Sequence, residues 1–126
     1  MGIATKKRKT VLIVEDSLII LERMITALEE VEAIDFVMHA GTHKEASDLL
    51  GQLTPDLVLL DINLPDKSGI ELLKTIKEND NKVTVFMVTN HASEHYRTIC
   101  KNLGADYFID KLKDFYLIPE VISASS

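Results

Sequence analysis

Short apolar runs alternate with longer amphipathic stretches along the chain. The apolar runs, rich in β-branched and aromatic residues typical of strands, lie at residues 11–14, 36–40, 57–60, 83–88 and 107–109. The stretches between them repeat apolar residues every three or four positions, which predicts helices at 17–30, 43–53, 70–79, 93–103 and 114–122. Pro119 falls inside the last stretch and indicates either a kink or a late helix start near Ile118.

Strands that alternate with helices favour an α/β fold, in which a parallel sheet is covered by helices on both faces. The strand runs are continuously apolar, as expected for strands that are buried on both faces. The 126 residues are enough for one hydrophobic core. We therefore expect one domain at residues 10–122, with a basic lead-in at 1–9 and a frayed tail at 123–126.

Composition narrows the functional classes. The net charge of −6 argues against direct nucleic-acid binding, which needs a basic surface. No apolar run is long enough for a membrane span. Cys100 is the only cysteine, which excludes an internal disulfide and fits a reducing, cytoplasmic location. We expect Cys100 at a half-buried helix position, and His91 and His95 as exposed residues at a helix start.

Polar side chains follow four of the five predicted strands. They are Glu15, Asp16, Asp61, Thr89 and Lys111. Because the carboxyl ends of parallel strands meet at one edge of a sheet, where ligands bind in open α/β folds, we expect these side chains to converge. Each has a plain structural explanation when taken alone, such as helix capping, a local hydrogen bond or a surface charge. Their combination at one edge favours a functional site.

The chemistry of this set points to phosphoryl transfer. Carboxylates held close together repel one another, and a hard cation such as Mg²⁺ (or Mn²⁺) removes the conflict because it prefers oxygen ligands. The Asp61 carboxylate can attack phosphorus to give an acyl phosphate. Lys111 would balance the added charge, and the Thr89 hydroxyl would donate to a phosphoryl oxygen.

Three segments, residues 11–17, 56–73 and 104–111, resemble the receiver domain of two-component response regulators (the CheY-like family). The middle segment is the most specific, since a proline follows Asp61 by four residues and a glycine by eight. The resemblance implies a flavodoxin-like three-layer sandwich with strand order 2-1-3-4-5. It also implies Mg²⁺-dependent transfer to Asp61 from a sensor histidine kinase or a histidine phosphotransfer protein.

The same resemblance assigns the site residues. Glu15 and Asp16 match the acidic pair that binds the metal together with Asp61, and Asn63 matches the position that offers a backbone carbonyl. Thr89 and Phe108 match the switch hydroxyl and the switch aromatic, and Lys111 matches the lysine of the site. Asn63 and His91 flank the expected water path and would tune the lifetime of the phosphoryl group.

The expected output is a conformational change, not turnover of a substrate. The face built from residues 93–103, 107–109 and 114–122 would repack and control a protein partner, an output domain or a second copy of the chain. The domain would catalyse only its own phosphorylation and dephosphorylation. The sequence leaves open whether the receiver stands alone or is part of a longer protein.

Three positions depart from the pattern of the family. Leu112 replaces the proline that usually follows the lysine in a cis bond; a cis bond to leucine costs about 3 kcal/mol, so we expect a trans bond. Asn90 is larger than the usual residue there, and Phe108 lacks the hydroxyl of tyrosine. Two alternatives remain, namely a receiver that binds partners without phosphorylation and a phosphatase with Asp61 as nucleophile. The phosphatase is disfavoured because that class carries a second aspartate two residues after the nucleophile as general acid. In this chain that position is Asn63, which cannot act as an acid.

Overall fold

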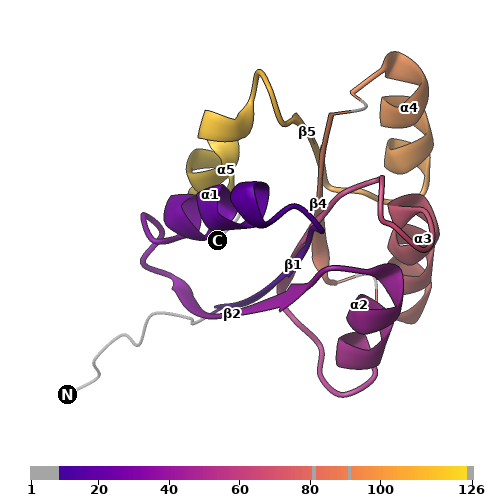
Figure 1. Ribbon diagram of the computed structural model, residues 1–126, viewed down its shortest axis with the longest axis horizontal. Helices are drawn as coiled ribbons and strands as arrows, with labels where there is room; N and C mark the ends of the chain where they lie inside the picture. The colour runs from indigo at the N-terminus through magenta and orange to yellow at the C-terminus, as the bar shows by residue number, and fades with distance from the viewer. Residues whose placement is uncertain (1–8, 81, 91, 125–126) are drawn as a thin grey trace.

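The computed structural model describes residues 9–80, 82–90 and 92–124, in which strands and helices alternate (Figure 1). The strands are β1 (Lys9–Val14), β2 (Ile34–Ala40), β3 (Leu57–Leu60), β4 (Thr84–Thr89) and β5 (Tyr107–Asp110). The helices are α1 (Leu18–Leu28), α2 (His43–Leu50), α3 (Gly69–Asn79), α4 (Glu94–Asn102), the 3₁₀ helix η1 (Phe115–Leu117) and α5 (Ile118–Ala124).

The strands form a parallel sheet with the order β2-β1-β3-β4-β5. Helices α1 and α5 cover one face, and α2, α3 and α4 cover the other (Figure 1). The expected three-layer α/β fold and its strand order are therefore confirmed. In the register, Val14 pairs with both Ala40 and Leu60, so the carboxyl ends of the three neighbouring strands are level.

Alternating residues of β1 build the two halves of the core. Val11 and Ile13 pack in the cluster beneath α1 and α5, whereas Leu12 and Val14 pack in the cluster beneath α2, α3 and α4. All four residues are fully buried, as are most residues of β3 and β4. The central strands are thus apolar on both faces, and polar residues are confined to the strand ends.

The end of α2 and the start of α5 decide two expectations from the sequence. Helix α2 ends at Leu50 with Gly51 as its C-cap, so the expected continuation to residue 53 is wrong, and Leu53 is exposed. Helix α5 starts at Ile118 after η1, which confirms the late start. Pro119 therefore lies in the first turn, where no intrahelical partner is needed for the missing N–H, and the alternative of a kink is wrong.

The first strand and the last helix extend slightly beyond their expected bounds. Strand β1 begins at Lys9, the last residue of the expected basic lead-in, and residues 1–8 lie outside the described part. Helix α5 continues to Ala124, two residues beyond the expected helix end.

Ser17 is the N-cap of α1, and its hydroxyl accepts a hydrogen bond from Ile20 N at 3.4 Å.

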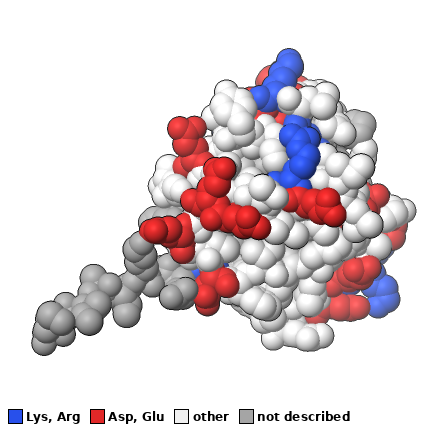
Figure 2. Space-filling view, turned by 60° about the vertical axis from the view of Figure 1, so that its left-hand side comes forward, with Lys and Arg blue, Asp and Glu red and all other residues white. Residues whose placement is uncertain are grey.

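Acidic side chains are more prominent than basic ones on the face shown in Figure 2. This view agrees with the net charge of −6. A partner that approaches this face would meet a mainly negative field. In the part of the chain that the structure describes, no helix is both long and apolar enough to cross a membrane.

Candidate functional site

Glu15 and Asp61 lie side by side at the carboxyl edge of the sheet because the backbone pairing continues one residue beyond the strands. The N–H of Glu15 donates to the Ala40 carbonyl at 3.0 Å, and that of Asp61 donates to the Val14 carbonyl at 3.1 Å. Both carboxylates are nearly inaccessible, with exposed fractions of 1% for Glu15 and 5% for Asp61. The strand ends, and not a flexible loop, position these two groups.

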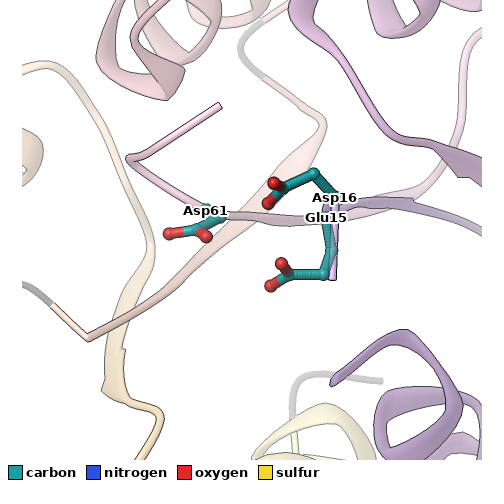
Figure 3. Close-up of side chains that lie close together, drawn as sticks. All are labelled: Glu15, Asp16 and Asp61. Atoms are coloured by element: carbon teal, nitrogen blue, oxygen red, sulfur yellow. The ribbon is translucent and has the colours of Figure 1, made fainter. Parts of the chain in front are cut away.

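Asp16 completes an acidic cluster with Glu15 and Asp61 (Figure 3). One carboxylate oxygen from each residue lies within 4.8 Å of the others, and Asp16 is exposed where the other two are buried. Three negative charges at this separation repel one another. Oxygen donors in this arrangement suit a hard divalent cation.

Lys111 reaches across the edge from the end of β5 and contacts both buried carboxylates. Its Nζ lies 2.8 Å from Asp61 Oδ2 and 2.5 Å from Glu15 Oε1, and the residue is 5% exposed. Its N–H donates to the Thr89 carbonyl at 3.0 Å, which fixes the start of the lysine side chain. The described residues contain no cis peptide bond, so the lysine reaches Asp61 from the expected trans Lys111–Leu112 bond.

Burial and charge act together on the ionisation of this group of side chains. Burial raises the pKa of Glu15, and the repulsion from Asp61 adds to it, although the contact with Lys111 and the hydrogen bond from Ser17 N–H act against it. For Lys111, burial alone would lower the pKa. The close contacts with Asp61 and Glu15, together with the negative charges of these two groups, outweigh burial and raise the pKa of Lys111 above its ordinary value.

The loop after Asp61 folds back onto the Asp61 carboxylate and backbone. Asn63 N–H points to Asp61 Oδ1 at 3.3 Å. Gly69, the first residue of α3, donates from its N–H to the Ile62 carbonyl at 2.7 Å. A Cβ at Gly69 would lie 1.9 Å from the Asp61 carbonyl oxygen, so only glycine permits this approach of α3.

The acidic cluster opens into a cleft of about 290 Å³. Its lining residues are Glu15, Asp16, Ser17, Ile20, Asp61, Asn63, Asn90 and Lys111. Asn90 is one of these lining residues, and its narrowing of the access to Asp61 stays a prediction from the sequence. The cleft is therefore polar and open to solvent on one side, and the buried carboxylates form its floor.

A sequence profile of the response regulator receiver domain matches residues 11–122. The chain belongs to the response regulator receiver domain family. Protein CcdB of Bacillus subtilis (strain 168) is 34% identical over 113 residues, which are 90% of this chain and 93% of CcdB. Chemotaxis protein CheY of Halobacterium salinarum is 34% identical over 105 residues, which are 82% of this chain and 84% of that protein.

Solved structures share the receiver fold. A CheY-like response regulator receiver domain protein from Methanospirillum hungatei JF-1 has a TM-score of 0.80 at 30% identity, with 94% of each chain covered. The Mn²⁺-bound form of response regulator Rcp1 has a TM-score of 0.78 at 28% identity, with 92% of each chain covered. The transcriptional regulatory protein YdfI of Bacillus subtilis is 32% identical, but the receiver chain spans only 47% of it.

The two expected switch residues of the receiver lie on one face of the sheet. Thr89 is fully buried at the end of β4, and Phe108 is half-buried in β5. Phe108 pairs with Met87, two residues before Thr89, so both side chains face the layer of α2, α3 and α4. His91, the expected lifetime residue, lies outside the described residues.

Asp66 is a receiver residue for which the sequence predicted no role. Its Oδ1 accepts from His43 N–H at 2.8 Å and its Oδ2 from Lys44 N–H at 3.0 Å, so the loop after β3 caps α2. Loss of hydration would raise the pKa of Asp66, but the backbone donors outweigh it and lower the pKa. An aspartate after a proline signals a loop acceptor, but not which helix it will cap.

Proposed function

We propose that this receiver domain accepts a phosphoryl group on Asp61 from a phosphohistidine of a sensor histidine kinase or a histidine phosphotransfer protein. One observation carries the proposal. Asp61 is buried at the floor of an open cleft, with Lys111 Nζ 2.8 Å from one oxygen and two further carboxylates beside it. A nucleophile, a cationic donor and a set of metal ligands are thus present together.

The donor set fits Mg²⁺ or Mn²⁺. Among the described side chains, Glu15 Oε1 is buried without a well-directed hydrogen-bond donor, although Lys111 Nζ is close to it. Glu15, Asp16, Asp61 and the backbone carbonyl of Asn63 would hold the ion, and the related regulator Rcp1 has a Mn²⁺-bound form. When bound, the ion supplies Lewis-acid neutralisation of the phosphoryl charge.

The transfer step is a displacement at phosphorus. An oxygen of Asp61 forms the new O–P bond while the N–P bond to the donor imidazole breaks and its electron pair stays on the nitrogen. Lys111 donates to a phosphoryl oxygen from its position beside Asp61. Thr89 supplies a hydroxyl donor to another oxygen. The domain catalyses this step and the later hydrolysis of its own acyl phosphate.

Phosphorylation would act through Thr89 and Phe108. The phosphoryl group itself carries about −1.5 to −2 charge, which draws the Thr89 hydroxyl toward the site. Phe108 then turns into the vacated space, and the surface formed by α4, β5 and α5 repacks for a protein partner, an output domain or a second copy of the chain. Such a switch biases a pre-existing equilibrium between two arrangements.

Asn63 and His91 are proposed to tune the lifetime of the phosphoryl group. Asn63 lines the cleft beside Asp61 and can alter how water reaches phosphorus. The measurement is the rate of phosphate loss from the purified acyl phosphate after exchange of each residue. Unchanged rates for both exchanges would remove this part of the proposal.

The central experiment is incubation with Mg²⁺ and acetyl phosphate, followed by intact mass measurement. The wild type should gain one labile phosphoryl group, and Asp61→Asn should gain none. Asp48→Asn is the matched control because it makes the same chemical change at an exposed aspartate of α2. The control should be phosphorylated as the wild type is.

The outcomes separate the alternatives. A wild type that gains no phosphoryl group with Mg²⁺ present contradicts phosphoryl acceptance and favours a receiver that only binds partners. Continuous hydrolysis of unrelated phosphoesters, lost in Asp61→Asn, favours the phosphatase. A phosphoryl group that persists in Asp61→Asn places the acceptor elsewhere.

A further inference from the structure

Arg97 in α4 contacts the expected switch residue directly. Its guanidinium carbon lies 4.7 Å from the centroid of the Phe108 ring and above it. Its Nη1 donates to the Phe108 carbonyl at 3.4 Å, and its Nε lies 3.5 Å from Glu94 Oε1. The guanidinium is therefore attached to β5 by the backbone of the same residue whose ring it covers.

The contact with Arg97 gives the Phe108 ring an electrostatic interaction with a charged group, although the ring carries no polar atom. Phenylalanine has no hydroxyl to bind water or a backbone group, so a cation can interact with it only through the ring face. The face of an aromatic ring carries partial negative charge and attracts a guanidinium. Both side chains are partly exposed, so the contact lies at the protein surface.

We propose that Arg97 is a positioning residue that holds Phe108 in the arrangement seen here and thereby sets the threshold of the switch. The inference rests on the proposed function, in which Phe108 turns toward Thr89 when Asp61 is phosphorylated. A ring that turns inward leaves the guanidinium, whereas the hydrogen bond to the Phe108 carbonyl can persist. The ring contact therefore stabilises the unphosphorylated arrangement selectively.

Selective stabilisation has a measurable consequence at the site. A contact that is made only in the unphosphorylated arrangement lowers the affinity of any ligand that binds only the phosphorylated arrangement. The effect is reciprocal, so loss of the contact must strengthen the binding of a phosphoryl mimic by the same factor. For a partly exposed cation–π contact, this factor is about two- to fivefold.

The experiment measures beryllofluoride affinity at fixed Mg²⁺ for the wild type, four single variants and one double variant. Arg97→Gln should bind about two- to fivefold more tightly than the wild type, and Arg97→Lys should lie between them because lysine keeps the charge without the planar stack. Lys101→Gln, at an exposed site on the same helix, removes the same charge and should match the wild type. Arg97→Gln should have no effect when Phe108→Leu is already present.

A second readout uses the unphosphorylated protein. Fluorophenylalanine is incorporated, and the Phe108 resonance is assigned by its loss in Phe108→Leu. Arg97→Gln should shift this resonance, and Lys101→Gln should not. The resonance tests whether Arg97 holds the ring in place, independently of phosphoryl chemistry.

The results distinguish the two proposals. An unchanged Phe108 resonance in Arg97→Gln overturns the inference, as does an equal gain in affinity for Lys101→Gln or in the Phe108→Leu background. If the wild type binds no beryllofluoride while the resonance still responds to Arg97→Gln, the proposed phosphoryl acceptance fails and the role of Arg97 in holding Phe108 stands.

Discussion

Replacement of Gly69 by alanine tests how closely α3 must approach Asp61, the proposed acceptor. The added Cβ would lie 1.9 Å from the Asp61 carbonyl oxygen and 2.9 Å from its carbonyl carbon. Real Cβ atoms essentially never approach another heavy atom within 3.0 Å. Both obstructing atoms belong to the backbone at the end of a buried strand, so no side chain can rotate away. The start of α3 and the backbone of Asp61 must separate by roughly 1 Å.

The size of the effect follows from this displacement. Overpacking a core costs about 1–3 kcal/mol, and a backbone obstacle places Gly69→Ala toward the upper end of that range. The midpoint of thermal unfolding should fall by roughly 10 °C for a domain of this size. A shift of about 1 Å in a reacting group costs on the order of 10²-fold in rate, so phosphorylation of Asp61 should slow by that factor.

Two assays check the prediction: thermal and urea unfolding followed by circular dichroism, and the initial rate of phosphorylation by acetyl phosphate at a temperature where the variant is folded. Gly51→Ala is the matched control. Its Cβ would make ordinary contacts of 3.4 Å with Asp48 O and 3.5 Å with Ser47 O. Its stability should be unchanged or raised by up to about 1 kcal/mol. The reasoning is refuted if Gly69→Ala matches Gly51→Ala in stability and in rate.

Two further predictions concern buried ionisable groups. Burial raises the pKa of Glu15 above its ordinary value of 4.5, so the folded state favours the protonated side chain. The contribution of Glu15 to the free energy of unfolding is therefore complete below pH 4.5 and is lost as the pH rises through the pKa of the folded protein. Glu15→Gln should therefore raise the free energy of unfolding at pH 7 without metal, with a smaller difference below pH 4.5, and should weaken Mg²⁺ binding in a titration followed by NMR. Burial also raises the pKa of the Cys100 thiol to about 11, so a disulfide reagent at pH 8 should label it only as fast as the chain unfolds. Rapid labelling of the folded protein, or a Glu15→Gln variant that is less stable at pH 7, would contradict these two expectations.

Strands β1, β3 and β4 were predictable because each contains an apolar run that ends in charged or polar residues, whereas β2 contains Asp35 and His39 and starts two residues before its predicted start. Strand β3 has the predicted bounds, and β1 differs only in its start. Helix α2 was predicted too long because Leu53 continues the helical spacing. Periodicity shows where apolar residues recur along the sequence but not whether their side chains reach the core. The Leu53 side chain is exposed and does not reach it.

Contacts between elements were less predictable than the elements. Cys100 was expected to be half-buried but is fully buried, because α4 packs its cysteine against the core beneath α2, α3 and α4. Asp66 caps α2 by accepting from the backbone of residues 23 and 22 positions earlier in the chain. No local sequence pattern specifies a pairing over that separation. The stacking of Arg97 on Phe108 likewise depends on how α4 lies along β5.

Lys111 shows why residue types at the site were predictable while their interactions were not. The sequence placed a lysine at the same edge as the carboxylates, where it would balance an incoming phosphoryl group. The structure shows that Lys111 Nζ contacts both Asp61 and Glu15 and so balances part of their charge. Three carboxylates against one ammonium leave the cluster with a formal charge of −2, which a single divalent cation would neutralise. A bound cation would then compensate Glu15 and Asp16, so that Lys111 is free to meet the phosphoryl group on Asp61.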